Sequence, residues 1–187
     1  MLQRSMGDSM ESVRRNAAFC VGVLVEATGT ALSAHFMQML SWLYPLCSRS
    51  EPQQTTDMGG ADVDNAVSSV ARMINAAQTL IPLDRVLPVM LSSLPLRSDY
   101  SEGENIYGCI ARLVLSGEPN ALNLLPKILE VFAQVFLPDS KATAETKAVV
   151  KSCLQQLTSD PQGQNAIRAA LASCSAETAQ TIENAIR

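Results

Sequence analysis

The sequence predicts an all-α fold. Apolar residues recur at steps of three and four along most of the 187 residues, which is the period of one helix face. No window alternates between apolar and polar residues over the length of a half-buried strand. Proline and glycine divide the chain into segments of roughly 12–18 residues, a common length for helices in globular proteins.

One glycine marks the boundary between the first two predicted helices, and an apolar stripe predicts the third. Ser9–Ala27 ends before Gly29, and Ala31–Cys47 begins after it. Ala61–Ala77 is predicted from its regular spacing. Its apolar stripe consists of Val63, Val67, Val70, Ile74 and Ala77.

The next two predicted helices have clear boundary signals. Leu83–Ser93 lies between two prolines, which interrupt a helix because they lack an N–H group. Ser101–Ser116 ends before Gly117. It opens with Ser101 followed three residues later by Glu104, the pattern of a capping box.

The last four predicted helices fill the chain to its end. Asn120–Phe136 and Ala142–Thr158 carry apolar stripes of the same kind and are separated by a proline. Pro161–Ser173 opens on its own proline, which suits the first turn of a helix. Ala176–Ile186 follows Ser175, a residue type favoured as an N-cap.

The helices also pair at a regular period. A proline stands inside or at the start of an apolar run at Pro45, Pro88 and Pro126, which are 43 and 38 residues apart. Each next helix begins with a polar or acidic turn. Such a period with two helices and no strand is typical of HEAT-type or armadillo-type solenoids, so we predict a single α-solenoid segment of about four helix pairs over residues 1–187. A four-helix bundle is the alternative, but it does not predict the repeated proline.

One long loop is predicted, at residues 48–60. It is rich in Ser, Gln, Thr and Gly, and we expect it to be flexible. We read the five cysteines as buried thiols in a reducing compartment, since neither they nor the single histidine have metal-ligand spacing. The sequence therefore predicts no metal and no cofactor.

The composition argues against two classes of partner. A net charge of −4 and a pI near 5.0 are the opposite of what direct binding to nucleic acid requires. The N-terminus has no apolar signal core, and the longest uncharged run, Ala27–Ser48, is broken by polar residues. We expect no membrane insertion.

Four stretches carry a recognisable pattern. Glu11–Gly29 places a Val-Arg pair at the entry of an apolar helix, and Val63–Ile74 contains an Asp-Asn pair at its start. Val86–Ile110 passes through Leu-Pro-Leu into an acidic helix start, and Leu124–Phe136 fits the next outer helix. Together, from about residue 11 to residue 157, they resemble the carboxy-terminal HEAT repeats of the importin-β (karyopherin-β) family, in particular its importin-4 type.

The resemblance implies a function in nuclear import. Receptors of this family bind basic cargo in the cytoplasm, cross the nuclear pore through weak contacts with its proteins, and release cargo on binding Ran GTPase. Importin-4-type members resemble carriers of core histones and ribosomal proteins. The chain is much shorter than such receptors, so the resemblance implies a carboxy-terminal part found in cytoplasm and nucleus, whose Ran and pore contacts lie in missing repeats. A general HEAT-repeat scaffold or adaptor is the alternative.

Cargo binding is expected at the acids of the inner helices. Residues 49–118 carry five basic and nine acidic side chains, whereas the stretches on both sides are neutral. An acidic groove would attract Lys- and Arg-rich segments. The alternative roles are stabilisation of helix N-termini for the acids and burial between repeats for the tyrosine. The cargo-binding candidates are Asp62, Asp64, Asp99, Glu102, Glu104 and Tyr107.

A second set of polar residues is predicted to join one repeat to the next. Arg14 and Arg15 belong to the Val-Arg pattern, and Asp64 and Asn65 could bridge to Arg72 or to a neighbouring backbone. Catalysis has no support, because a single histidine has no nucleophile or acid at a diagnostic spacing and no phosphate-binding or nucleophile motif occurs. We therefore predict a binding protein and not an enzyme. The predicted inter-repeat ladder consists of Arg14, Arg15, Asn65 and Arg72.

Overall fold

A computed structural model of the chain describes residues 1–49 and 59–187. All regular secondary structure in these two ranges is helical, which confirms the predicted all-α class. The flexible loop predicted at residues 48–60 falls mainly on residues 50–58, which lie outside the described residues. The helices are α1 (Leu2–Met6), α2 (Glu11–Thr28), α3 (Phe36–Cys47), α4 (Ala61–Ala77), α5 (Leu83–Ser92), α6 (Gly103–Leu115), α7 (Pro119–Asn123), α8 (Leu125–Val135), α9 (Ala144–Leu157), α10 (Pro161–Leu171) and α11 (Ala176–Ile186).

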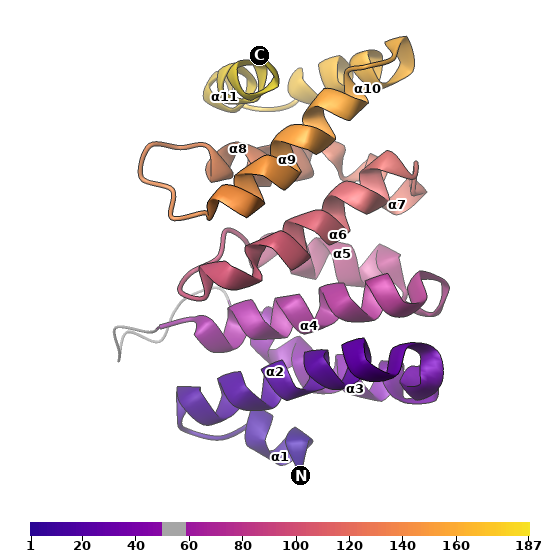
Figure 1. Cartoon of the computed structure of the whole chain (residues 1–187), viewed down its shortest axis with the longest axis vertical. Helices are drawn as coiled ribbons and strands as arrows, with labels where there is room; N and C mark the ends of the chain where they lie inside the picture. Colours follow the sequence, from indigo (N-terminus) through magenta and orange to yellow (C-terminus); the bar gives the residue numbers. More distant parts are fainter. Residues whose placement is uncertain (50–58) are drawn as a thin grey trace.

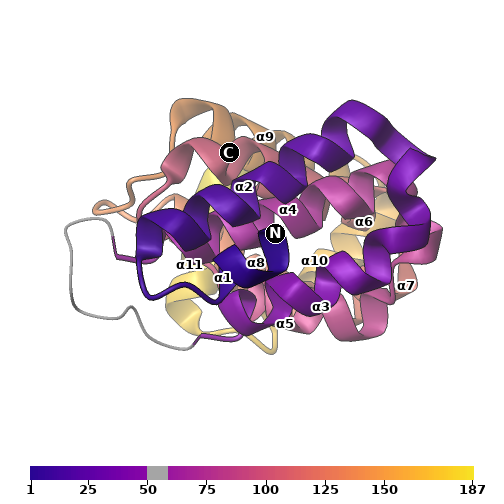
Figure 2. The same ribbon diagram turned by 90° about the horizontal axis from the view of Figure 1, so that it is seen from below.

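The helices stack in two layers along an elongated molecule. Helices α2, α4, α6 and α9 lie one above another, each packed on the next, and form what we call the inner layer (Figure 1). Helices α3, α5 and α8 lie behind them, and the view from below separates α2 and α4 from α3 and α5 (Figure 2). The predicted pairs, each a proline-containing helix followed by a helix with a polar start, correspond to α3 with α4, α5 with α6 and α8 with α9.

Two predicted helices are divided in the structure. The start of the predicted helix Ala31–Cys47 belongs to a 3-10 helix, Gly29–His35, and α3 begins only at Phe36. The predicted helix Asn120–Phe136 is split at Leu124 into α7 and α8. Proline has no N–H to donate to an earlier turn, and Pro126 accordingly stands in the first turn of α8.

The caps agree with the sequence at one end of the chain and differ in the middle. Ser175 caps α11 as predicted, because its hydroxyl accepts a hydrogen bond from the backbone N–H of Thr178 at 3.1 Å. Ser101 does not cap α6, so the predicted capping box is wrong. It lies in a 3-10 turn, and its hydroxyl donates to Oδ1 of Asp99 at 2.6 Å.

Helices of the inner layer approach each other closely where small residues meet. A Cβ atom added to Gly22 in α2 would stand 2.6 Å from Oγ of Ser69 in α4. The same hydroxyl donates to the backbone carbonyl of Ala18 at 2.7 Å, so α2 and α4 are joined at a spacing that a larger residue would not permit. Gly103 of α6 faces Thr146 of α9 in the same way.

The N-terminal part of the chain is more apolar than our expectation of no membrane insertion implied. The stretch Glu11–Cys47 is long and apolar enough, by length and composition, to cross a membrane. In the structure it is divided among α2, the 3-10 helix and α3, and both α-helices pack on α4. Part of its apolar surface thus belongs to the core between the first two helix pairs.

Candidate partner-binding surface

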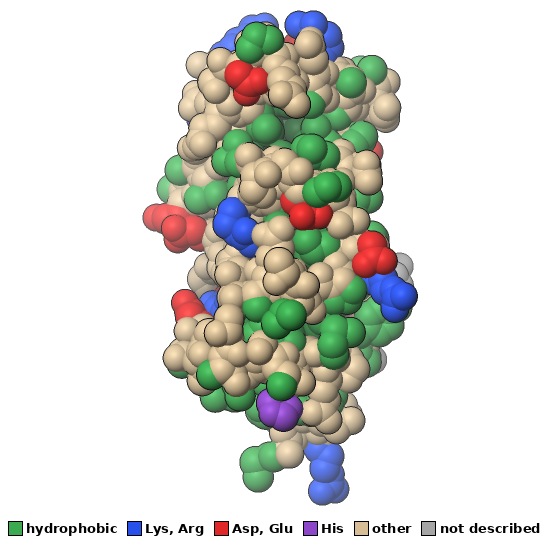
Figure 3. Space-filling view, turned by 90° about the vertical axis from the view of Figure 1, so that its right-hand side faces the viewer, with side chains coloured by type: hydrophobic (Ala, Val, Ile, Leu, Met, Phe, Trp, Pro, Cys, Tyr) green, Lys and Arg blue, Asp and Glu red, His purple; other side chains and the backbone are tan. Residues whose placement is uncertain are grey.

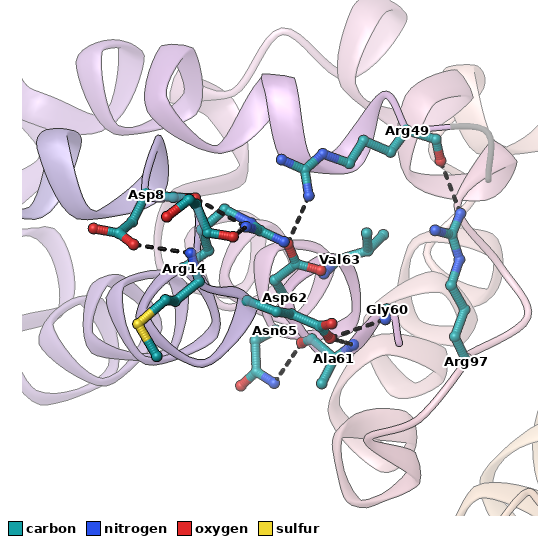
Figure 4. A network of polar contacts seen from close by, with 12 residues as sticks. Asp8, Arg14, Arg49, Gly60, Ala61, Asp62, Val63, Asn65 and Arg97 are labelled. Atoms are coloured by element: carbon teal, nitrogen blue, oxygen red, sulfur yellow. Dashed lines mark hydrogen bonds and ion pairs between the residues drawn. The ribbon is translucent and has the colours of Figure 1, made fainter. Parts of the chain in front are cut away.

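Asp62, in the first turn of α4, joins two arginines from different parts of the chain (Figure 4). Its Oδ2 atom lies 2.6 Å from Nε of Arg14 in α2 and 2.7 Å from Nη1 of Arg49, which follows α3. Arg14 also donates from Nη1 to the backbone carbonyls of Asp8 and Ser9, both at 2.9 Å. The side chains of Arg14 and Asp62 are only 5% and 3% exposed, so this junction holds a desolvated ion pair whose hydrogen bonds are satisfied.

Asp64 forms a second junction one helical turn into α4. Its carboxylate accepts hydrogen bonds from three consecutive backbone N–H groups, those of Arg97, Ser98 and Asp99, at 2.8–3.1 Å. The neighbouring Asn65 donates from Nδ2 to Oδ2 of Asp99 at 2.9 Å. Burial raises the pKa of Asp64, and the three backbone hydrogen bonds oppose that rise. Asp64 thus fixes the loop that leads into the next repeat.

Arg72 forms the third junction, between α2, α4 and α6. Its Nη1 lies 2.9 Å from Oε2 of Glu102, and its Nε lies 3.2 Å from Oε2 of Glu26 in α2. Ser68 donates its hydroxyl to Glu102 and accepts a hydrogen bond from Nδ2 of Asn105 at 2.8 Å. A buried serine therefore links an arginine, a carboxylate and an amide from two adjacent repeats.

These junctions correct the expected acidic groove. Asp62, Asp64 and Glu102 are 2%, 1% and 7% exposed, and they bond to neighbouring helices and loops instead of facing solvent. Tyr107 is also buried, at 2% exposed, and packs its ring beside Phe132 with centroids 6.2 Å apart. Burying a carboxylate without a partner costs free energy, and these buried acids are each paired with an arginine or with backbone N–H groups.

Of the other cargo candidates, one is exposed and one is half-buried. Glu104 is exposed on α6 and lines an open groove of about 590 Å³ between α4 and α6. Asp99 is half-buried and engaged by Asn65. Arg72 and Arg112 also line this groove, so its charge is mixed and not acidic. The face of the molecule in Figure 3 likewise shows acidic and basic side chains scattered among apolar ones.

The ladder residues are not equally engaged. Arg14, Asn65 and Arg72 each bridge two elements, as described above. Arg15 makes no hydrogen bond or ion pair within residues 1–49 and 59–187, and its side chain is half-buried. Ser68 and Glu26 could not be predicted from the sequence, because a serine inside a helix and a lone glutamate give no spacing signal.

Exposed apolar side chains are a further feature that the sequence did not locate. Phe19 and Val23, one turn apart on α2, are 43% and 40% exposed, and Tyr44 on α3 is 58% exposed. Phe19 and Val23 thus form a short exposed apolar strip on α2.

Most of the cysteines are inert in this fold. Cys47, Cys109 and Cys153 are buried, as predicted, and burial raises the pKa of these thiols to about 12, about 11 and about 12. Cys20 is exposed, which differs from the prediction, and Cys174 is half-buried. Within the described ranges no cysteine is in a disulfide.

The chain is similar in sequence to known proteins. No protein-family profile matches the chain. It is 32% identical over 135 residues to the probable importin subunit beta-4 of Schizosaccharomyces pombe, which covers 72% of the chain and 12% of that protein. It is 30% identical over 171 residues to human importin-4, which covers 91% of the chain and 15% of that protein. Mouse importin-4 is 28% identical over 138 residues.

The similarity covers most of the chain but little of each relative. The chain spans less than a sixth of the length of the curated relatives it matches, at 12% and 15%. In the comparison with the human protein the aligned region makes up 171 of the 187 residues. The stacked helix pairs and these similarities together show that the chain is related to the importin-β family of HEAT-repeat proteins.

Proposed function

We propose that the chain is the carboxy-terminal part of a nuclear transport receptor of the importin-4 type. The observation that carries the proposal is the similarity to human importin-4 over 91% of the chain, in a molecule built of stacked helix pairs. The proposal places the protein in both cytoplasm and nucleus. Ran GTPase and nuclear pore proteins would be contacted through repeats outside this chain, and no catalytic step is assigned to it.

The cargo would be basic protein segments, such as those of core histones or ribosomal proteins. With three of the expected acids buried, the accessible carboxylates of the inner layer include Glu104 on α6 and Glu26 on α2, whose side chain is 68% exposed. The open groove between α4 and α6 supplies polar amide groups from Asn75 and Asn105. A Lys- or Arg-rich peptide would pair with the two glutamates and donate hydrogen bonds to these amides.

A titration tests the cargo surface directly. A fluorescently labelled basic histone-tail peptide is titrated into the chain by anisotropy, at low salt and at about 0.15 M salt, where charges more than ~8 Å apart are largely screened. Glu104→Lys and Glu26→Lys should each weaken binding by a factor of about 2–5, as expected for solvent-exposed charge pairs. Glu183→Lys, which makes the same change at an exposed position of α11, is the matched control and should leave binding unchanged.

The outcomes separate transport from a purely structural role. Binding that weakens with salt and with the two inner-layer substitutions, but not with the control, supports the cargo surface. Equal effects of all three substitutions would show only a response to net charge and would refute the assigned surface. A folded chain that binds no basic peptide would favour the alternative of a HEAT-repeat scaffold.

A further inference from the structure

A cavity of about 310 Å³ lies at one side of the stack, next to the loop that Asp64 of α4 fixes. It is formed where that loop, from α5 to α6, meets the loop from α8 to α9, and both loops lie on the left-hand side of the molecule in Figure 1. Its apolar walls include Pro95, Leu96, Val135 and Leu137. At roughly ten times the ~30 Å³ that one water molecule occupies in the liquid, it has room for a side chain and an adjoining polar group.

Two residues that line this cavity carry a polar group with no hydrogen-bond partner in the described part of the chain. Oε1 of Gln134 is shielded from solvent and accepts no hydrogen bond. Tyr107 is 2% exposed, and its hydroxyl makes no hydrogen bond within residues 1–49 and 59–187, although it is not among the atoms fully shielded from solvent. A buried polar group that lacks a partner costs free energy, so native proteins normally supply one from protein, water or ligand. Gln134 and Tyr107 line the same cavity, so one polar ligand bound there could supply hydrogen-bond partners to both.

The charges at the cavity cancel. Lys141 and Asp139 are both exposed beside it, and the ammonium of Lys141 lies 5.9 Å from the ring centroid of Tyr100. Burial and the negative charge of Asp64 both raise the pKa of Tyr107, so its hydroxyl is neutral. With one charge of each sign at the rim and neutral groups inside, the site favours a neutral ligand over an ion.

We propose that this cavity binds a secondary amide carrying an apolar substituent, as presented by one residue of an extended peptide segment. The amide N–H would donate to Oε1 of Gln134, and the amide carbonyl would accept from the Tyr107 hydroxyl. One planar group would satisfy both polar groups, and the apolar substituent would fill the space between Leu96 and Val135. The site goes beyond the proposed cargo surface, because it reads a neutral peptide unit and not a basic charge.

The test uses two small probes that differ in one N–H group. N-(3-methylbutyl)acetamide contains a secondary amide and a leucine-like branch, and 3-methylbutyl acetate is its ester counterpart without the N–H. Each is titrated into the 15N-labelled 187-residue chain and followed by amide chemical shifts. The amide should give saturable shifts around the α5–α6 and α8–α9 loops, and the ester should bind more weakly by a factor of about 2–10, the worth of one neutral hydrogen bond.

Two variants assign the two contacts. Tyr107→Phe removes only the hydroxyl, and Gln134→Met replaces the amide by an apolar group of similar length. Each should weaken binding of the amide probe by a factor of about 2–10. Gln180→Met, the same exchange at an exposed position of α11, is the control and should not change it. Thermal unfolding of each variant shows that the fold is retained.

Three results would overturn the proposal. One is the absence of saturable shifts at the cavity up to the solubility limit of the amide. Another is equal affinity for amide and ester, which would show that only apolar volume is recognised. The third is unchanged affinity in both folded variants, which would show that water satisfies the two polar groups. Binding here should be insensitive to salt, so its failure is distinguishable from failure of the salt-sensitive cargo surface.

Discussion

Neutralising Asp62 should destabilise the chain strongly, because two arginines converge on its carboxylate. Asp62→Asn keeps the shape of the side chain and removes the charge that faces Arg14 at 2.6 Å and Arg49 at 2.7 Å. Breaking a buried pair by neutralising one partner typically costs about 3–5 kcal/mol, since the other charge stays buried. Arg14 keeps two backbone carbonyl acceptors, so we expect the lower end, about 3 kcal/mol.

Thermal unfolding measures this cost. In a domain of this size about 1 kcal/mol shifts the midpoint by roughly 2–4 °C, so Asp62→Asn should lower it by about 6–12 °C. Asp84→Asn is the matched control. Its carboxylate lies 3.8 Å from Arg85 with both side chains more than 60% exposed, at 66% and 84%, and a surface pair of this kind is worth about 0–1 kcal/mol.

The two arginines that face Asp62 should differ in their contributions to stability. Arg49→Met should cost less than Arg14→Met, because Arg49 is 30% exposed and Arg14 is 5% exposed. A midpoint for Asp62→Asn within about 2 °C of the Asp84→Asn control would refute the assignment of Asp62 as a junction between repeats.

Three further predictions follow from burial and close packing. Gly22→Ala should destabilise the chain by about 1–3 kcal/mol. Gly108→Ala, whose new Cβ would meet nothing nearer than 3.9 Å, should instead stabilise it by up to about 1 kcal/mol. Urea unfolding compares the two variants, and equal effects would contradict the close approach of α2 and α4. At pH 8 the exposed Cys20 should react rapidly with a thiol reagent, while Cys47, with its pKa raised to about 12, should react only on unfolding. Because Cys174 is only half-buried, the check uses a Cys20→Ser, Cys174→Ser double variant, and rapid reaction of that variant would disprove this. Burial raises the pKa of Asp64 above its value in the unfolded chain. The stabilising contribution of Asp64 is therefore full below the unfolded pKa and is lost as pH rises through the folded pKa. The stability of wild type relative to Asp64→Asn should decline with rising pH across that window, and urea midpoints that change in parallel for the two proteins would argue against it.

Helix positions were largely predictable from sequence because they depend on local chemistry. Ala61–Ala77 and Ala176–Ile186 match α4 and α11 at both ends. The prediction failed where two local signals competed. In Asn120–Phe136 the apolar stripe continues through Pro126, and the stripe alone does not show that the missing N–H divides the helix. The short helix α1 was missed because five residues carry too little periodicity.

The candidate site was less predictable, since the same carboxylate can face solvent or a neighbouring repeat. Asp64 and Glu104 look alike in sequence, as acids at the start of an apolar helix. In the structure Asp64 is buried against the backbone of the next loop, and Glu104 is exposed. Their difference depends on which residue from about 30 positions away arrives beside them, which periodicity does not encode.

Composition and spacing were sufficient to establish the all-α class, the paired helices and their period, because helix formation and amphipathic burial depend on residues within a few turns. Tertiary contacts decided how the acidic excess is used. Stacking brings Arg14 to Asp62 and Arg72 to Glu102, and desolvation at those contacts makes pairing favourable over exposure. The same stacking leaves Glu104 free on the inner layer and encloses Tyr107 and Gln134 around one cavity, an arrangement of residues from different repeats that no single segment of sequence contains.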